Sequence, residues 1–166
     1  MPNQILVHIE KLNPDIKLPA YANLGDSGMD VMASEDIIIN AQSTVIVKTG
    51  LKVAIPYGYE IQVRPRSGIS LNTPLRVSNS PGTIDSEFRG EIGIIITNIS
   101  TSINNVSPIT YFSLTSKGKQ GNYYINKGDK IAQLVLQKVP RILWVEVNDI
   151  EKIGGNRNGG FGSTGI

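Results

Sequence analysis

The sequence predicts an all-β protein in which short strands form a sandwich or barrel. Short apolar runs recur along the 166 residues and are separated by turn-forming residues, which is the pattern of such folds. The chain contains 17 glycines and 9 prolines, which favour many turns and few long helices. Its length suits one domain with a buried core, and no linker divides it.

The composition narrows the functions that the chain can have. Hydrophobic residues make up 40% and charged residues 18%, as in a soluble globular protein. A net charge of +2 is too small to hold long nucleic acid by phosphate neutralisation, so we expect a local site for a small anionic ligand. No stretch approaches membrane-spanning length, and the N-terminus lacks a basic region before a long apolar run. We therefore expect a cytoplasmic protein without nucleic-acid or membrane partners.

Two residue types restrict the possible metal chemistry. The chain has no cysteine, and His8 is its only histidine, which excludes disulfides, thiolate chemistry and zinc sites built from these ligands. A metal would be a hard cation on oxygen ligands, and we expect Mg²⁺ that is carried in on phosphates.

The first half of the chain contains the expected short strands, with turn residues between them. Asp30 lies between apolar residues in the second strand, and this pattern alone favours an edge position that faces water. The expected strands are residues 4–12, 29–33, 37–39, 44–48, 51–55 and 59–63.

The segment that follows, residues 64–71, combines two arginines with an expected short helix instead of another strand. Arg64 and Arg66 project to one side, and Ser67 is expected to cap a short helix. A helix N-terminus attracts phosphate through free N–H groups and the positive end of its dipole, and Arg66 would add charge. A capped turn with solvated arginines fits the same residues, so both interpretations stay open.

Residues 79–93 can form a ligand-holding loop because they combine turn formers with acidic, aromatic and basic side chains. Pro81 and Gly82 predict a turn. A surface hairpin with solvated charges is the alternative. In an extended conformation, one face would carry Asp85, Glu87 and Arg89, with Phe88 on the other.

The rest of the chain contains further expected strands and a glycine-rich tail. Gln133 interrupts an apolar strand, and a buried amide needs partners in the core or on a ligand. Phe161, alone among glycines, suits a flexible flap that stacks on a planar ring. We expect a strand buried on both faces over residues 91–97, a hairpin of 109–114 with 122–125, and strands over 131–136 and 143–147.

Taken together, five stretches resemble the five motifs of the trimeric deoxyuridine triphosphate pyrophosphatase (dUTPase) family, in family order. The resemblance covers nearly the whole chain, except that residues 100–122 look longer than their usual counterpart. The matching stretches are residues 27–31, 65–68, 79–91, 128–133 and 159–165.

This resemblance implies a fold, an assembly and a reaction. The fold would be a jelly-roll β-barrel over residues 1–153, with residues 154–166 as a flexible flap that closes over the active site. The assembly would be a homotrimer with three sites at subunit contacts. The reaction would be Mg²⁺-assisted hydrolysis of dUTP to dUMP and pyrophosphate, with the metal held through phosphates and water rather than by direct protein ligands.

The family roles transfer to residues of this chain by position. Asp85 would orient and deprotonate the water that attacks the α-phosphorus, and Asp30 would support the site. The residues that would hold phosphates are Arg66, Ser67, Gly68 and Gln133. Asn79, with the backbone of Thr83, Ile84 and Gly93, would recognise the uracil edge. From the tail, Phe161 would cover the base, and Gly162, Ser163 and Thr164 would hold the terminal phosphate.

Two positions depart from the family pattern. Phe88 stands where the family usually has a tyrosine whose ring packs on the deoxyribose and excludes a 2′-hydroxyl. Phenylalanine keeps the ring, so we expect this discrimination to survive. Arg157 is one residue nearer to Phe161 than the arginine of the family's fifth motif. The resemblance assigns Arg157 to the terminal phosphate, but at a position one residue away from that of the family's arginine.

Two alternatives accompany this interpretation. A dCTP deaminase would share the architecture, but the fifth motif and the surroundings of Asp85 argue against it. A nucleotide-binding regulatory relative without turnover is suggested by Phe88 and Arg157, whereas the intact Asp85 favours an enzyme.

Overall fold

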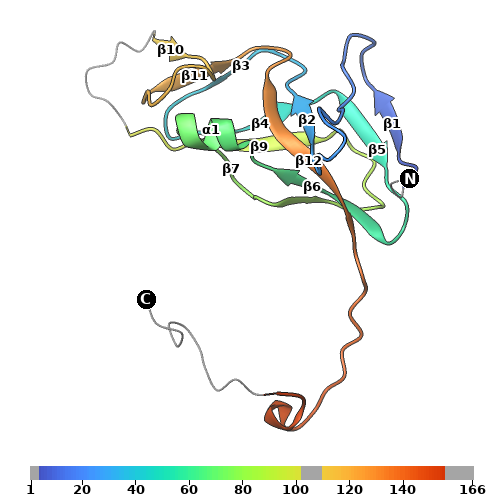
Figure 1. The fold of residues 1–166 in the computed structure, drawn as a ribbon. Helices are drawn as coiled ribbons and strands as arrows, with labels where there is room; N and C mark the ends of the chain where they lie inside the picture. The colour runs from blue at the N-terminus through green and yellow to red at the C-terminus, as the bar shows by residue number, and fades with distance from the viewer. Residues whose placement is uncertain (1–3, 102–109, 156–166) are drawn as a thin grey trace.

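The computed structural model describes residues 4–101 and 110–155, and these residues form an all-β body, as predicted (Figure 1). Among them, no helix is long and apolar enough to cross a membrane. The helical segments are α1 (Ser67–Asn72) and the 3-10 turn η1 (Ile150–Lys152). The strands are β1 (His8–Lys11), β2 (Met29–Met32), β3 (Ile37–Ile39), β4 (Thr44–Lys48), β5 (Leu51–Ala54), β6 (Tyr59–Arg64), β7 (Leu75–Val77), β8 (Gly82–Ile84), β9 (Gly93–Asn98), β10 (Tyr111–Phe112), β11 (Asn122–Ile125) and β12 (Lys130–Lys138).

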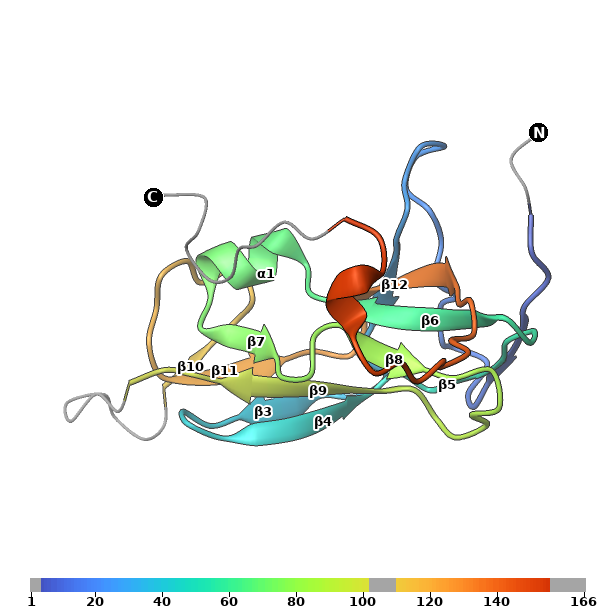
Figure 2. The same cartoon turned by 90° about the horizontal axis from the view of Figure 1, so that it is seen from below.

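The sheet that positions the candidate site has the order β2-β12-β6-β8. Its longest strand, β12, pairs antiparallel with β2 and with β6, so Gln133 has Asp30 on one side and Arg64 on the other. The other sheets have the orders β4-β9-β7, β10-β11-β3 and β1-β5. Figure 2 shows β6, β8 and β12 on one side of the body, with β4 and β9 on the other.

The core lies between these sheets and consists mainly of aliphatic side chains. Fully buried members include Ile39, Val47, Ile94 and Ile125, and the ring of Tyr123 is buried with them. Because such side chains come from every sheet, the apolar runs of the sequence converge on one core.

Strand β9 corrects the expectation of a strand buried on both faces. Ile94 and Ile96 are buried, whereas Ile95 and Thr97 are partly exposed. An antiparallel sheet with one face on the core produces this alternation. On the outer face, the Thr97 hydroxyl lies 2.8 Å from Thr44 Oγ1 and 2.6 Å from Ser78 Oγ.

The expected hairpin after β9 is also wrong in its direction. Strands β10 and β11 do pair, but they run parallel. The intervening segment doubles back, and the Gly118 N–H donates to the Asn72 carbonyl at the end of α1. This detour returns the chain to the start of β10, as a parallel pair requires. Residue 109, where the expected strand began, lies outside the described residues.

Residues 143–147 were expected to form a strand but lie in an extended segment that leaves the body after β12 (Figure 1). Their side chains are exposed, with Leu143 at 88% and Trp144 at 84%. The apolar pattern is that of a strand, but within the described part of this chain no sheet neighbour pairs with it.

Helix α1 forms where expected, but Ser67 is not its cap. Arg66 is the N-cap residue, with extended backbone angles, and no side chain caps this end. Ser67 is therefore the first helical residue.

Candidate active site

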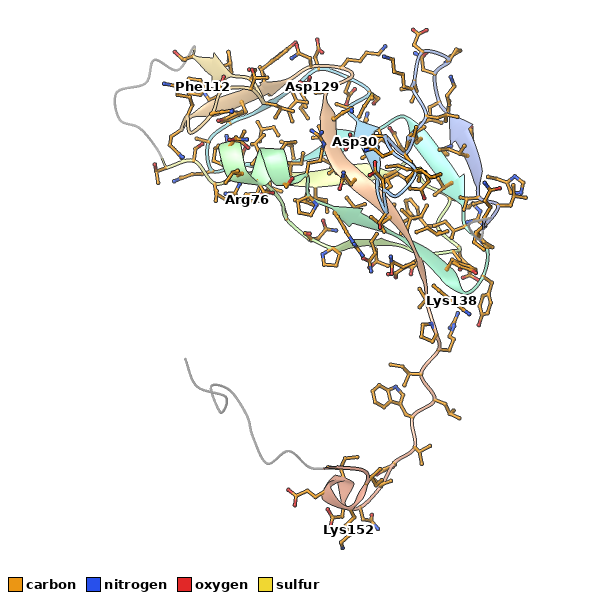
Figure 3. The ribbon with its side chains drawn as sticks, in the orientation of Figure 1. Asp30, Arg76, Phe112, Asp129, Lys138 and Lys152 are labelled. Carbon is orange, nitrogen blue, oxygen red and sulfur yellow. The ribbon has the colours of Figure 1, made fainter. Side chains whose placement is uncertain are left out.

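Asp30 on β2 is the centre of a charged group at one end of the central sheet (Figure 3). Arg66 Nε donates to Asp30 Oδ1 at 2.9 Å, and Gln133 Nε2 donates to the same oxygen at 3.3 Å. Lys130 Nζ lies 3.0 Å from Asp30 Oδ2. Both carboxylate oxygens are thus partnered, and the part-buried amide of Gln133 has a protein partner.

The strand register explains why these side chains meet. Strand β2 is at the edge of its sheet, as predicted for Asp30, but the carboxylate is paired and only 17% exposed. On β12, Gln133 is opposite Asp30 and Lys130 is opposite Met32, with a register shift between Lys130 and Ala132. Strict alternation would place Lys130 and Gln133 on opposite faces, and the bulge brings both to the Asp30 face.

The electrostatics of this group keep Asp30 ionised. Partial burial alone would raise the pKa of Asp30, but hydrogen bonds from Lys130, Arg66 and Gln133, with the attraction of the Arg66 charge, hold it below its usual value of 3.8. Two cations share one carboxylate, so the group keeps a net positive charge. The group can bind an anion, and the same partners make Asp30 a poor acceptor of a proton near neutral pH.

The residues after Arg66 leave room for such an anion. Ser67 and Gly68 begin α1 directly beside the arginine. A Cβ atom added at Gly68 would meet nothing within 4 Å, so the space around this backbone is open. The Arg66 guanidinium is also anchored by a bond from Nη1 to the Lys130 carbonyl at 3.3 Å.

A second group of predicted site residues lies around β8. Asp85 follows this strand in a turn that the Phe88 N–H closes by donating to the Asp85 carbonyl at 3.1 Å. The charged residues therefore do not share one face of an extended segment. Arg89 Nη1 donates to the Ser86 and Phe88 carbonyls, because the folded turn brings these oxygens to it.

Two glycines in this second group allow close packing. The Phe88 ring folds over Gly90, where an added Cβ would lie 2.7 Å from the ring. At Gly93, the first residue of β9, an added Cβ would lie 2.5 Å from Ile46 Cγ2. Asn79 lies close to Gly82, which begins β8 after the Ser80–Pro81 cis peptide. The predicted uracil-reading residues are thus close in sequence but lie on strands of two different sheets. Asn79, Thr83 and Ile84 come before or on β8, and Gly93 begins β9.

The two groups do not meet within one chain. Strand β6 pairs with β8 so that Ile61 is opposite Ile84, which places Asp85 beside Glu60. Arg66 lies six positions further along, beyond the other end of β6. At about 3.3 Å per residue, roughly 20 Å separates the general-base candidate from the cationic group.

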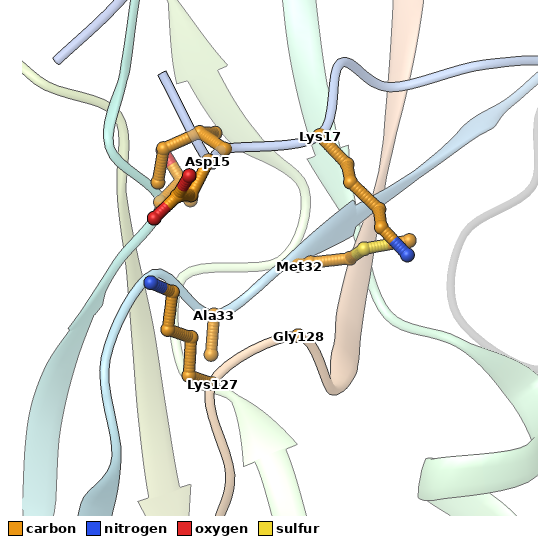
Figure 4. Close-up of a pocket in the computed structure, with 8 residues that line it drawn as sticks. Asp15, Lys17, Met32, Ala33, Lys127 and Gly128 are labelled. Carbon is orange, nitrogen blue, oxygen red and sulfur yellow. The ribbon is translucent and has the colours of Figure 1, made fainter. Parts of the chain in front are cut away.

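The groove at Asp85 contains no residue of the cationic group. Asp85 lines an open groove of about 380 Å³ with Glu60 and Arg141. A different cavity of about 290 Å³, drawn in Figure 4, lies between the loop of Asp15 and Lys17 and the turn at Gly128. It contains none of the predicted site residues.

The structure provides no cluster of direct metal ligands among the described residues and does not describe the predicted tail residues. Within residues 4–101 and 110–155, no cluster of three or more acidic or histidine side chains could hold a metal directly. The tail residues Arg157, Phe161, Gly162, Ser163 and Thr164 lie outside the described residues.

The fold and the two groups define a class of protein, an all-β domain with a cationic group that can bind an anion. The dUTPase family model matches residues 14–109. The deoxyuridine 5′-triphosphate nucleotidohydrolase of Zymomonas mobilis is 39% identical over 98% of this chain and 99% of its own, and that of Helicobacter pylori is 36% identical over 96% and 97%. The chain therefore belongs to the dUTPase family.

Solved structures show the same fold. The Staphylococcus bacteriophage 80alpha dUTPase with dUPNHPP has a TM-score of 0.86 and 27% identity, covering 98% of this chain and 100% of its own. The dUTPase of Staphylococcus aureus phage phi11, in which a species-specific insert is seen, has a TM-score of 0.80 and 28% identity over 89% and 99%. The body of this chain is thus the jelly-roll-like barrel that the motifs implied.

Proposed function

We propose that this protein hydrolyses dUTP to dUMP and pyrophosphate. The observation that carries the proposal is its similarity over nearly the full chain to curated dUTP nucleotidohydrolases, together with an acidic residue in the turn after β8. The charged group around Asp30 adds the chemistry expected for a triphosphate.

In this mechanism Asp85 is the general base. Its side chain lines an open groove, so water can reach it. Asp85 takes a proton from the water whose oxygen bonds to the α-phosphorus, and the bond from that phosphorus to the bridging oxygen breaks. Pyrophosphate leaves with the bridging oxygen.

Asp30 has a positioning role, because its oxygens are already occupied by Arg66, Lys130 and Gln133. Arg66 uses Nε on Asp30 and Nη1 on the Lys130 carbonyl, which leaves its other N–H groups for a ligand beside the open backbone at Gly68. These groups would hold phosphate oxygens.

Mg²⁺ fits this site as a companion of the substrate. The described residues offer no cluster that would hold the ion alone, whereas a triphosphate supplies the oxygen ligands that Mg²⁺ prefers. When bound there, Mg²⁺ would neutralise the charge that develops on the phosphates. The phi11 phage relative has been solved with a structural Mg(II) ion.

Strand β8 and the residues that flank it would select the base and the sugar. Strand β8 is at the edge of its sheet, so the backbone groups of Thr83 and Ile84 that point away from β6 can pair with a base edge. Cytosine exchanges a donor and an acceptor relative to uracil and would not match. The ring of Phe88 would pack on the deoxyribose, as the tyrosine ring does in the family.

We further propose a homotrimer in which each site combines residues of different copies. The cationic group and Asp85 are roughly 20 Å apart along β6, so they cannot act on one phosphate chain within a single copy. The exposed apolar segment around Leu143 and Trp144 also calls for a covering surface. Residues 154–166 remain the proposed flap, as the sequence predicts, and the cytoplasm remains the proposed compartment.

A direct assay separates this proposal from its alternatives. The purified protein is incubated with dUTP or dCTP in Mg²⁺ while pyrophosphate and ammonia are measured. We expect pyrophosphate from dUTP and no ammonia from dCTP. Ammonia from dCTP would indicate a deaminase, and dUTP binding without turnover would indicate a regulatory protein.

A further inference from the structure

The resemblance to the dUTPase family gives roles to Asp30, Arg66 and Gln133 but none to Lys130, the fourth member of the charged group. Its ammonium lies 3.0 Å from Asp30 Oδ2, on the opposite carboxylate oxygen from the one that Arg66 occupies. The Lys130 side chain is 46% exposed, compared with 31% for Arg66. It therefore reaches Asp30 from the accessible side of the group.

The bulge in β12 is what places Lys130 there. A regular strand would turn Lys130 away from Gln133, but the register shift before Ala132 turns both toward Asp30. Asp30 comes from β2 and Arg66 from the start of α1, so three elements bring their polar side chains to one point.

Two cations on one carboxylate add little to the free energy of folding. A single half-exposed ion pair contributes little to folding, and a second cation on the same carboxylate repels the first. The surplus positive charge becomes favourable when a further anion arrives. An ammonium has three donors, and Asp30 takes one, which leaves N–H groups for that anion.

We propose that Lys130 binds the phosphates that leave as pyrophosphate, a role that rests on the proposed dUTP hydrolysis. The general base Asp85 is in the other group and must act at the α-phosphate. The cationic group around Asp30 consequently lies along the β- and γ-phosphates. Lys130 and Arg66 hold these oxygens from the two sides of the Asp30 carboxylate.

The test compares binding of two ligands to full-length protein by calorimetry. The probes are α,β-imido-dUTP with Mg²⁺ and dUMP, and the variants are Lys130→Gln and Lys130→Arg. The matched control is Lys138→Gln, at the opposite end of β12 where the chain leaves the body (Figure 3).

Lys130→Gln should weaken binding of the imido analogue roughly tenfold or more, the scale of a charge-assisted hydrogen bond, and change dUMP binding less than about twofold. Lys130→Arg should recover most of the loss, and Lys138→Gln should bind both ligands normally. The analogue's affinity should also fall less steeply with salt in Lys130→Gln than in the wild type.

Two outcomes would overturn the role. Unchanged affinity for the analogue shows that Lys130 does not touch the phosphates, and an equal loss for both ligands shows a structural effect. If Lys130→Gln does not fold, Lys130→Met, which keeps the aliphatic stem, is measured in its place. Failure of the proposed reaction is seen separately, as wild-type protein that does not release pyrophosphate from dUTP.

Discussion

Gln133 lies opposite Asp30 in the β2–β12 pair, and its Nε2 atom donates to Asp30 Oδ1 at 3.3 Å. The amide thus completes the set of donors around a carboxylate that two cations also contact. The three donors hold Asp30 in its charged form, and Asp30 in turn fixes the direction of the Arg66 guanidinium.

Gln133→Glu keeps the shape of this side chain and replaces the donor with a second carboxylate. The surplus positive charge of the group disappears, and two carboxylates face each other. We expect KM for dUTP to rise at least several-fold, with an oligomeric state equal to that of the wild type as the control. Steady-state kinetics at neutral pH measures the effect, and an unchanged KM would remove Gln133 from the phosphate site.

Asp85→Asn retains shape and removes basicity. Loss of a general base typically lowers turnover 10²- to 10⁴-fold, so kcat should fall in this range while binding of α,β-imido-dUTP changes little. Glu87→Gln, in the same turn, is the matched control and should keep turnover near normal. Near-normal kcat in Asp85→Asn would make the assignment wrong.

The depressed pKa of Asp30 predicts how its contribution to stability depends on pH. The unfolded chain has the ordinary value near 3.8 and the folded chain a lower one. The stabilisation is therefore complete above the unfolded pKa and disappears as pH falls through the folded pKa. Asp30→Asn cannot show this change, so its difference from the wild type should be constant near neutral pH and shrink in acid. Urea unfolding at fixed protein concentration measures it, and a difference independent of pH contradicts the ion pairing.

Gly93→Ala should destabilise the start of β9. The new methyl would lie 2.5 Å from Ile46 Cγ2, and the exposed Ile46 side chain would have to move, at a cost of about 1 kcal/mol. Thermal unfolding checks this change. Ile46→Ala in the same chain should restore stability because it removes the contacting methyl, and the absence of any rescue would place the strain elsewhere.

The sequence predicted most strands of the body because they follow simple patterns. Ile37–Ile39 and Thr44–Lys48 form strands with the expected bounds, and Gln133 has the polar partner that a buried amide needs. The role of Lys130 was missed because it depends on a bulge, and strict alternation places Lys130 on the wrong face. A possible signal was its sequence position, directly after a Gly-Asp turn and at the start of a strand.

Other errors depend on contacts that residue patterns do not specify. The residues around Trp144 have the apolar pattern of a strand, but a pattern does not supply the neighbour that a strand needs. The turn at Asp85 is closed by a backbone bond to Phe88 that alternation of charges did not indicate. The separation of Asp85 from Arg66 follows from strand register, which residue patterns specify only weakly.

Sharing of the site between copies is tested most directly by mixing two inactive variants. Arg66→Ala removes one of the two cations of the phosphate site and Asp85→Asn removes the base, so trimers of either variant alone should be inactive. When the two are unfolded together in equal amounts and refolded, random trimers should contain intact pairs at about a quarter of their sites, and dUTP hydrolysis should return to that fraction of the wild-type rate. Activity no higher than that of the separate variants would contradict a site built from more than one copy.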